Sequence, residues 1–256
     1  MRHSFQYKNG RRLSYADFGD RDGFPILLQH GLIASIEDEH LFDQLVRLHA
    51  RVISIARPGY GESSPYELSC YAEWADIAAV VIQELGLGQF DLLGGSSGAP
   101  YGYALGCRFP EQVRNIYILS GMPAMYDAVV QSFWPYPPIT DLRMPELEKS
   151  AHEWFFANLS PEALRQNDIR DSMMNNAFGV AQDLKLRSID WGYSLSDVRQ
   201  PVYMRHSKTD DSVPYRTAVR TAELLPHCEL ELTESGPHFS QEVLDDFICN
   251  TIAPHI

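Results

Sequence analysis

A serine flanked by glycines is the strongest chemical signal in this sequence. Residues 90–100 read Phe-Asp-Leu-Leu-Gly-Gly-Ser-Ser-Gly-Ala-Pro, so Ser96 stands at the centre of a Gly-x-Ser-x-Gly pentapeptide. A strand-like stretch precedes it, and Pro100 suits the first turn of a helix, where the missing N–H is no loss. A serine at such a sharp strand-to-helix turn has an exposed Oγ. The segment lacks the Gly-Lys-Ser/Thr of a P-loop and the Gly-x-Gly-x-x-Gly of a dinucleotide-binding loop. We therefore interpret Ser96 as a nucleophile.

A serine hydroxyl needs a general base, and the base needs a carboxylate that orients it. His238 lies in Ser-Gly-Pro-His-Phe-Ser, between a strand-like stretch and the last helical pattern. Asp210 and Asp211 follow an earlier strand-like stretch in Thr-Asp-Asp-Ser-Val-Pro. All these loops leave the carboxyl ends of expected strands, where catalytic groups converge in an open α/β sheet.

The elements that would position these residues form a mostly parallel sheet covered by helices, because apolar, β-rich segments alternate with turns and helical patterns. Residues 3–8 and 12–18 around Asn9-Gly10 predict a hairpin at the start. The other expected strands are residues 25–30, 51–56, 90–94, 114–120, 201–206 and 228–233. The clearest helical patterns are residues 71–85, 215–225 and 239–251.

The alternation stops between residues 121 and 196. This stretch holds six prolines, five of the 7 Met and three of the 4 Trp, and it shows no convincing strand. We expect a largely helical cap at 121–196 over an α/β core formed by residues 1–120 and 197–256. Its Met and aromatic side chains suit the wall of a substrate pocket, and equally the small core of an insertion.

The order Ser96, Asp210, His238 on these elements resembles the α/β-hydrolase fold superfamily, and in particular its capped, esterase-like serine hydrolases. The resemblance covers nearly the whole chain. It implies a mostly parallel eight-stranded sheet and a catalytic triad of these three residues. It also favours Asp210 over Asp211, because the family pattern of Asp, two residues and then Val-Pro falls on Asp210.

Two further segments carry the resemblance. Gln29-His30-Gly31-Leu32 resembles the family's His-Gly loop, which implies that the backbone N–H groups of Leu32 and Ser97 form an oxyanion hole. His30 would organise this loop and not act as a base, since one general base suffices. Residues 57–63 resemble the family's Gly-rich loop after the fourth strand, to which we assign a structural role. Haloalkane dehalogenases and epoxide hydrolases of this fold carry an aspartate at the position of Ser96, which argues against both activities.

Charge and composition limit the partners. Lys and Arg total 21 and Asp and Glu total 34, which gives a formal net charge of −13 that repels a phosphate backbone. No run approaches the roughly 18 apolar residues of a membrane span, and residues 1–8 lack the apolar stretch of a signal peptide. We therefore expect a cytoplasmic protein without nucleic-acid or membrane partners, as a monomer or homodimer.

The four cysteines are scattered at positions 70, 107, 228 and 249, without a Cys-x-x-Cys motif or zinc-ligand spacing. We expect no metal and no organic cofactor. The predicted activity is hydrolysis of a small, mostly hydrophobic ester through an acyl-enzyme. The alternatives are a C–C bond hydrolase acting on a diketone-like substrate and a ligand-binding, receptor-like module with vestigial hydrolysis.

Overall fold

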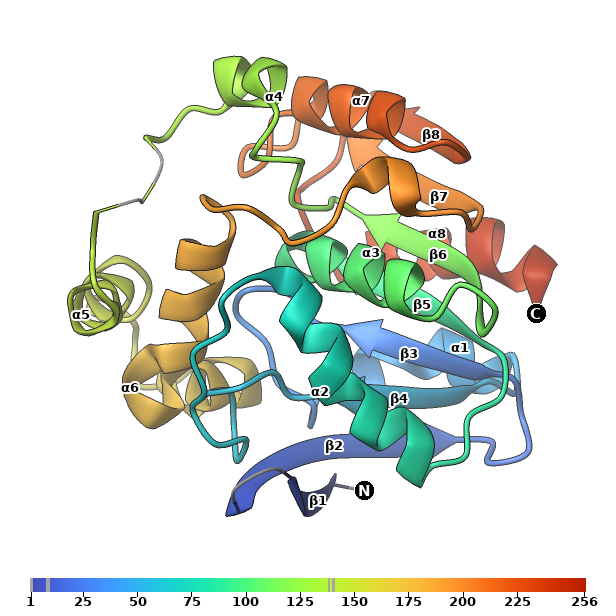
Figure 1. Ribbon diagram of the computed structural model, residues 1–256, viewed down its shortest axis with the longest axis horizontal. Coiled ribbons are helices and arrows are strands. Elements are labelled where there is room, and N and C mark those ends of the chain that lie inside the picture. The colour runs from blue at the N-terminus through green and yellow to red at the C-terminus, as the bar shows by residue number, and fades with distance from the viewer. Residues whose placement is uncertain (1, 8–9, 138, 140) are drawn as a thin grey trace.

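Eight strands form one sheet in the computed structural model, which describes residues 2–7, 10–137, 139 and 141–256. The strand order is β1-β2-β4-β3-β5-β6-β7-β8 (Figure 1). Strands β1 and β2 are antiparallel to each other, β2 is antiparallel to β4, and all later pairs are parallel. The strands are β1 (Arg2–Tyr7), β2 (Arg11–Gly19), β3 (Pro25–Gln29), β4 (Arg51–Ile55), β5 (Phe90–Gly95), β6 (Val113–Leu119), β7 (Val202–Ser207) and β8 (Cys228–Thr233). The predicted mostly parallel, eight-stranded sheet is confirmed, whereas Lys8 and Asn9 of the predicted hairpin lie outside the described residues.

Helices cover both faces of this sheet. They are α1 (Asp43–Arg47), α2 (Tyr71–Glu84), α3 (Ala99–Arg108), α4 (Ala128–Phe133), α5 (Met144–Phe155), α6 (Asn167–Leu186), α7 (Tyr215–Leu224) and α8 (Gln241–Phe247). Helices α2, α3 and α7 lie on the near face in Figure 1, and α1 and α8 lie behind the sheet. Because side chains alternate along a strand, Leu92 of β5 packs in one core with Trp74 of α2, whereas Leu93 packs in the other with Phe247 of α8.

The last helix begins later than its pattern suggested. The apolar pattern predicted a helix over residues 239–251, but α8 begins at Gln241. Ser240 is extended and its side chain accepts a hydrogen bond from the backbone N–H of Val243, which makes it the N-cap. His238 therefore lies in the loop ahead of the helix.

Helices α4, α5 and α6 all come from the stretch between β6 and β7, in which the described residues contain no strand. Helices α5 and α6 pack against each other through apolar side chains such as Leu147 and Val180. They lie beside the carboxyl ends of the central strands (Figure 1). Helix α6 is interrupted at residues 174–177, where Asn175, Asn176 and Ala177 have positive φ. The division into core and cap stays a prediction at this point.

Candidate active site

Ser96 lies at the turn that joins β5 to α3. Its φ is +48°, which places a non-glycine residue in the left-handed region. Such strain at a strand-to-helix turn is the geometry that exposes a nucleophilic serine. Gly98 is required here, because a Cβ at that position would lie 1.9 Å from the carbonyl oxygen of Gln29 on β3. The close approach of the turn to β3 therefore depends on glycine.

Three residues that are far apart in the sequence meet at this turn. Ser96 Oγ lies 2.9 Å from His238 Nε2, and His238 Nδ1 lies 2.7 Å from Asp210 Oδ2. With the Nδ1 proton donated to the carboxylate, Nε2 is free to accept the proton of the serine hydroxyl. The three side chains come from the loops that follow β5, β7 and β8. The geometry is that of a nucleophile, a general base and an orienting carboxylate.

The Asp210 carboxylate has more donors than His238 alone. Its Oδ1 accepts hydrogen bonds from the backbone N–H groups of Ser212 and Val213, both at 2.9 Å. His206 Nε2 lies 3.2 Å from Oδ2 and 2.8 Å from the carbonyl oxygen of Val213. Burial by itself would raise the pKa of Asp210, but the hydrogen bonds from His206, His238 and Val213 outweigh it and hold the pKa well below its usual range. The carboxylate is therefore ionised and can stabilise an imidazolium.

Asp211, the competing acid, is exposed, and its Oδ1 accepts a hydrogen bond from the Ser212 hydroxyl. Sequence reasoning assigned no role to His206. The signal available for it was its place on a buried strand, four residues before Asp210.

The loop after β3 is organised by the side chain of His30. Its Nδ1 lies 2.9 Å from the carbonyl oxygen of Gly31, and the backbone N–H of Arg57 donates to its Nε2 at 3.2 Å. Desolvation, followed by the Arg57 charge, lowers the pKa of His30 well below its ordinary value. The two ring nitrogens contact backbone groups of the loops after β3 and β4, so the geometry gives His30 an organising role.

The predicted oxyanion donors, Leu32 and Ser97, line the same cavity as Ser96 and His238. Their roles as backbone donors stay a prediction.

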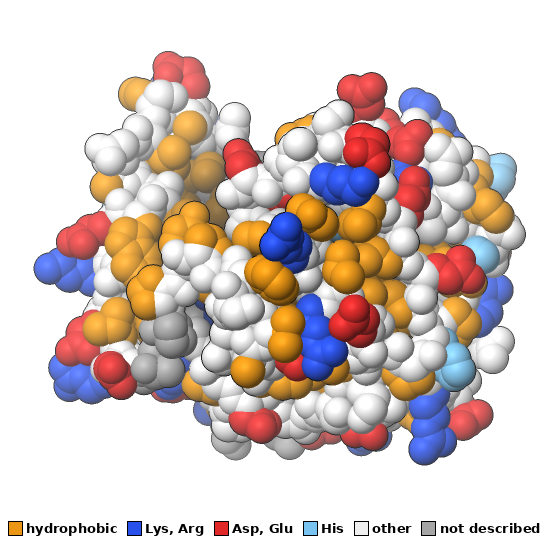
Figure 2. Space-filling model, turned by 90° about the horizontal axis from the view of Figure 1, so that it is seen from above, with side chains coloured by type: hydrophobic (Ala, Val, Ile, Leu, Met, Phe, Trp, Pro, Cys, Tyr) orange, Lys and Arg blue, Asp and Glu red, His pale blue; other side chains and the backbone are white. Residues whose placement is uncertain are grey.

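This cavity has a volume of about 970 Å³ and mostly apolar walls. Part of the wall comes from the strands and the loops that follow them, including Leu32 and Ser96. Much of the rest comes from the stretch between β6 and β7. The residues from this stretch include Met122, Trp134, Tyr136, Ile139, Trp154, Phe155 and Leu184. Seen from above (Figure 2), the surface is hollowed towards the side of α5 and α6, with hydrophobic side chains along the hollow. The site can thus hold a small, largely apolar molecule beside Ser96.

Comparison with known proteins places the chain in a family. A model of the alpha/beta hydrolase fold matches residues 25–243. The chain belongs to the α/β-hydrolase fold family.

The chain is similar to proteins that carry different names. It is 25% identical over 243 residues to a 2-hydroxymuconate semialdehyde hydrolase of Pseudomonas putida, an alignment that covers 91% of this chain and 86% of the relative. Among solved structures, it is similar to an esterase from Exiguobacterium antarcticum, with a TM-score of 0.71, 23% identity and coverage of 93% and 92% of the two chains. A bromoperoxidase from Bacillus anthracis has a TM-score of 0.73 at 20% identity, with both chains fully covered. These structures share the fold.

The cavity beside Ser96 is also lined by a cationic side chain, Arg187, that the sequence did not indicate. Arg187, the residue after α6, lines the cavity and makes no ion pair within the described part of the chain. Its Cζ lies 5.8 Å from the centre of the Trp134 ring. Burial lowers the pKa of its guanidinium, although an arginine stays charged. The carboxylates of Asp38, Asp168 and Asp211 line the same cavity.

Among residues 2–7, 10–137, 139 and 141–256, no group of three or more His, Cys, Asp and Glu is arranged to hold a metal ion. Over the same residues, every helix is too short or too polar to cross a membrane. The four cysteines carry free thiols.

Proposed function

We propose that this protein is a serine hydrolase that cleaves a small, mostly hydrophobic ester through an acyl-enzyme on Ser96. The observation that carries the proposal is the hydrogen-bonded series from Ser96 Oγ through His238 to Asp210. The apolar cavity beside Ser96 supports the class of substrate.

In this mechanism, Ser96 Oγ attacks the ester carbonyl while His238 Nε2 takes its proton. The tetrahedral oxyanion is held by the backbone N–H groups of Leu32 and Ser97, each worth about 3–4 kcal/mol at the transition state. His238 then gives the proton to the leaving alcohol, and the C–O bond breaks to leave the acyl-enzyme. Water, activated by the same imidazole, releases the acid and restores Ser96.

Labelling with a fluorophosphonate tests the nucleophile. The wild-type protein should be labelled once, and Ser96→Ala should abolish labelling and lower kcat on p-nitrophenyl esters by several orders of magnitude. The matched variant Ser97→Ala keeps its backbone N–H and should still be labelled. Labelling that survives in Ser96→Ala and is lost in Ser97→Ala would overturn the assignment. A protein that is labelled but turns an ester over only once would instead support the ligand-binding alternative.

A second candidate is hydrolysis of a C–C bond in an acidic, diketone-like substrate. Arg187 favours it, because a guanidinium that makes no ion pair with any of the described residues and lines a mostly apolar pocket is suited to a substrate carboxylate. The Pseudomonas putida relative is named for hydrolysis of a semialdehyde, 2-hydroxymuconate semialdehyde, and not of an ester. In this reaction Ser96 would attack a ketone carbonyl, and the leaving carbon would receive the proton from His238.

Substrate charge separates the two candidates. If the substrate is an acid, Arg187→Met should lower kcat/KM about 10- to 100-fold on carboxylated dienoates and leave neutral p-nitrophenyl esters nearly unchanged. Arg165→Met is the control, because Arg165 is exposed and does not line the cavity. Equal effects of Arg187→Met on neutral and acidic substrates would contradict a carboxylate-binding role.

We also propose that residues 121–196 act as a helical cap on the core formed by residues 1–120 and 197–256. The cavity walls support this, since Trp134, Phe155 and Leu184 face the same space as Ser96. Such a cap would select substrates by shape and exclude water from the acyl-enzyme.

A further inference from the structure

Three consecutive backbone carbonyls of the loop after β3 are held by side chains from the loop after β4. Arg57 Nη1 donates to the carbonyl of His30 at 2.6 Å, and Arg57 Nη2 donates to that of Gly31 at 2.8 Å. The hydroxyl of Tyr60 donates to the carbonyl of Leu32 at 2.8 Å. Arg57 and Tyr60 thus hold the backbone of this loop, and the Gly31 carbonyl oxygen also lies 2.9 Å from His30 Nδ1.

The orientation of the Gly31 carbonyl also fixes the orientation of the Leu32 N–H. The C=O of Gly31 and the N–H of Leu32 belong to one planar, trans peptide unit, so they point in opposite directions. Whatever holds the Gly31 oxygen therefore aims the Leu32 N–H. This N–H is one of the two expected oxyanion donors, and donors of this kind act only when they are held at the correct position before reaction.

A single carboxylate of α6 connects these two side chains. Asp183 Oδ2 accepts a hydrogen bond from Arg57 Nη2 at 2.5 Å and lies 2.9 Å from the Tyr60 hydroxyl, whose one proton it shares with Leu32. Asp183 Oδ1 accepts from the Tyr101 hydroxyl of α3 at 2.5 Å. The side chains of Arg57 and Asp183 are each 1% exposed. Desolvation, which would lower the pKa of Arg57, is outweighed by Asp183 and the nearby tyrosines, so the guanidinium stays charged.

Helix α6 is also fitted closely to this loop. A Cβ on Gly179 would lie 2.3 Å from the Tyr60 ring, so the glycine allows the ring to lie directly against the helix. Asp183, one turn further along α6, then reaches the Tyr60 hydroxyl. A shift of α6 would therefore move both Gly179, which lies against the Tyr60 ring, and Asp183, which lies beside its hydroxyl.

We propose that Asp183 is a positioning residue for the hydrolysis: through Arg57 and Tyr60 it orients the Gly31–Leu32 peptide, so that the placement of α6 and the geometry of the oxyanion site are coupled. The inference rests on the proposed function. It predicts that a change at Asp183, which does not line the cavity, acts on the transition state more than on substrate binding.

Three variants test the coupling. Asp183→Asn removes the carboxylate that pairs with Arg57. Tyr60→Phe removes only a hydroxyl, and it serves as the test if Asp183→Asn does not fold. Asp91→Asn is the matched control, because Asp91 is equally buried and bound to Arg114 but lies at the opposite end of β5 from Ser96. Each variant is assayed well below its melting temperature, and rates are normalised to the fluorophosphonate-labelled fraction.

Asp183→Asn should lower kcat about 10- to 100-fold and Tyr60→Phe about 3- to 10-fold, with KM changed less than about threefold. Inhibition by a trifluoromethyl ketone, whose adduct with Ser96 carries an oxyanion, should weaken by the same factors. Asp91→Asn should change stability without changing either quantity. If Asp183→Asn and Tyr60→Phe also lose only stability, Asp183 is structural and the inference is wrong.

Hydrogen exchange gives a readout that does not depend on activity. Amide exchange in residues 30–33 should rise in Asp183→Asn and in Tyr60→Phe, and not in Asp91→Asn. Unchanged exchange in this loop would overturn the coupling even if the enzyme is active. If the wild-type protein is neither labelled nor active, the proposed function fails, and the loop exchange still decides whether Asp183 orients the loop.

Discussion

Asp210 shows how one side chain can be fixed by its neighbours before any substrate arrives. Its Oδ1 accepts hydrogen bonds from two backbone N–H groups, and its Oδ2 lies within hydrogen-bond distance of ring nitrogens of His206 and His238. Because both oxygens are engaged, the carboxylate cannot rotate away from His238. The imidazole is thereby held in the tautomer that leaves Nε2 facing Ser96.

Replacing Asp210 by asparagine should therefore damage catalysis more than folding. Asp210→Asn removes the charge that supports the His238 imidazolium, and we expect kcat on p-nitrophenyl esters to fall about 10⁴-fold. Asp211→Asn, at an exposed neighbouring position, should change kcat by less than about threefold. Steady-state kinetics of the two variants checks this. A damaging Asp211→Asn beside a nearly silent Asp210→Asn would show that the acid is assigned one residue too early.

The environment of His30 predicts a pH dependence of stability. Because its pKa in the folded protein is lowered, mainly by desolvation, the unfolded chain binds the proton more tightly. Its contribution to stability is therefore fully present above the unfolded pKa of about 6.5. It is lost as the pH falls from there towards the folded pKa, with a slope of at most about 1.4 kcal/mol per pH unit.

Urea denaturation between pH 5 and 8 measures this slope. His30→Gln should flatten the dependence below about pH 6.5, whatever it does to stability at pH 8, whereas His227→Gln, at an exposed position, should leave it unchanged. An identical slope in the His30→Gln variant and the wild type would show that His30 does not titrate differently on folding.

At the scale of elements, α5 presents adjacent phenylalanines to different surroundings. Phe155 lines the cavity, whereas Phe156, which directly follows α5, is 3% exposed and packs in the apolar core between α5 and α6. A helix advances by about 100° per residue, so neighbours along it face different directions. Phe155 is partly buried against the same core, so the pair compares a side chain that also faces the cavity with one that only packs.

Truncation of the two phenylalanines should have opposite signatures. Phe155→Ala should shift the preferred acyl chain length of p-nitrophenyl esters, by about 1–3 kcal/mol of discrimination between substrates. It should cost less stability than Phe156→Ala, because Phe155 is only partly buried against the core. Phe156→Ala should cost about 3–5 kcal/mol of stability and leave the chain-length profile unchanged. Thermal denaturation and kcat/KM across an ester series measure both effects. If Phe155→Ala loses only stability, α5 is not a specificity element.

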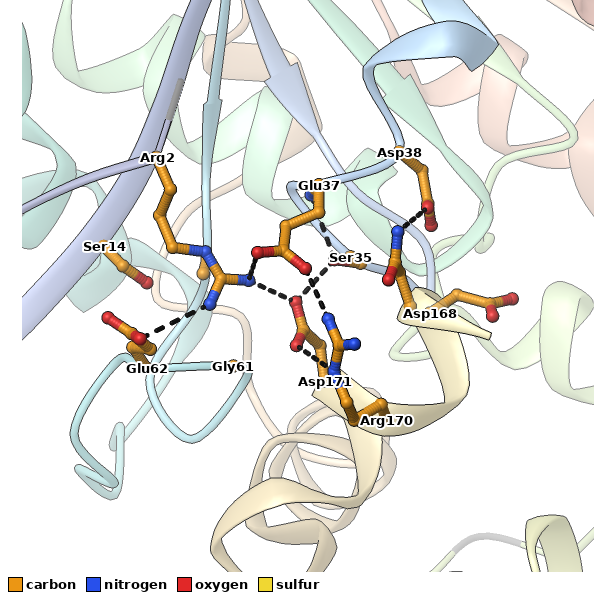
Figure 3. A network of polar contacts seen from close by, with 12 residues as sticks. Arg2, Ser14, Ser35, Glu37, Asp38, Gly61, Glu62, Asp168, Arg170 and Asp171 are labelled. Carbon is orange, nitrogen blue, oxygen red and sulfur yellow. Dashed lines mark hydrogen bonds and ion pairs between the residues drawn. The ribbon is translucent and has the colours of Figure 1, made fainter. Parts of the chain in front are cut away.

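At the scale of the whole molecule, a polar network links the start of the chain to α6. Arg2 of β1 binds Asp171 of α6 at 2.8 Å and lies 3.2 Å from Glu37 in the loop after β3 (Figure 3). The Ser35 hydroxyl donates to the same Asp171 oxygen at 2.5 Å, and the backbone N–H of Gly61 donates to the Asp171 carbonyl. Asp171 is nearly fully buried, so its hydrogen bonds are worth more than those of a surface pair.

We expect Asp171→Asn to destabilise the protein by about 1–3 kcal/mol, because the guanidinium of Arg2 loses its buried partner. The matched change Asp76→Asn, in an exposed ion pair with Arg108, should cost less than about 1 kcal/mol. Urea denaturation compares the two. Equal losses would mean that the network of Figure 3 contributes no more than a surface ion pair.

The sequence alone predicted a mostly parallel sheet, the order of strands and helices along the chain, the turn at Ser96 and the three residues that meet there. Strand and helix patterns and turn residues are local properties of the chain, and the order Ser96, Asp210, His238 is carried on them. The start of the last helix was misplaced by two residues, because the apolar pattern does not show which residue caps it.

Only the tertiary structure decided which side chains support that site. Asp183 contacts Arg57 across 126 positions in the sequence, His206 reaches Asp210 by the course of a loop, and Arg187 faces the cavity although its place beside α6 suggests nothing of the kind. Spacing along the chain does not encode these contacts. Those of Asp183 and Arg187 arise from how the helices between β6 and β7 pack on the sheet, and that of His206 arises from how the loop after β7 turns back. A buried carboxylate is identified only when the cation and hydroxyls that compensate its burial are seen around it.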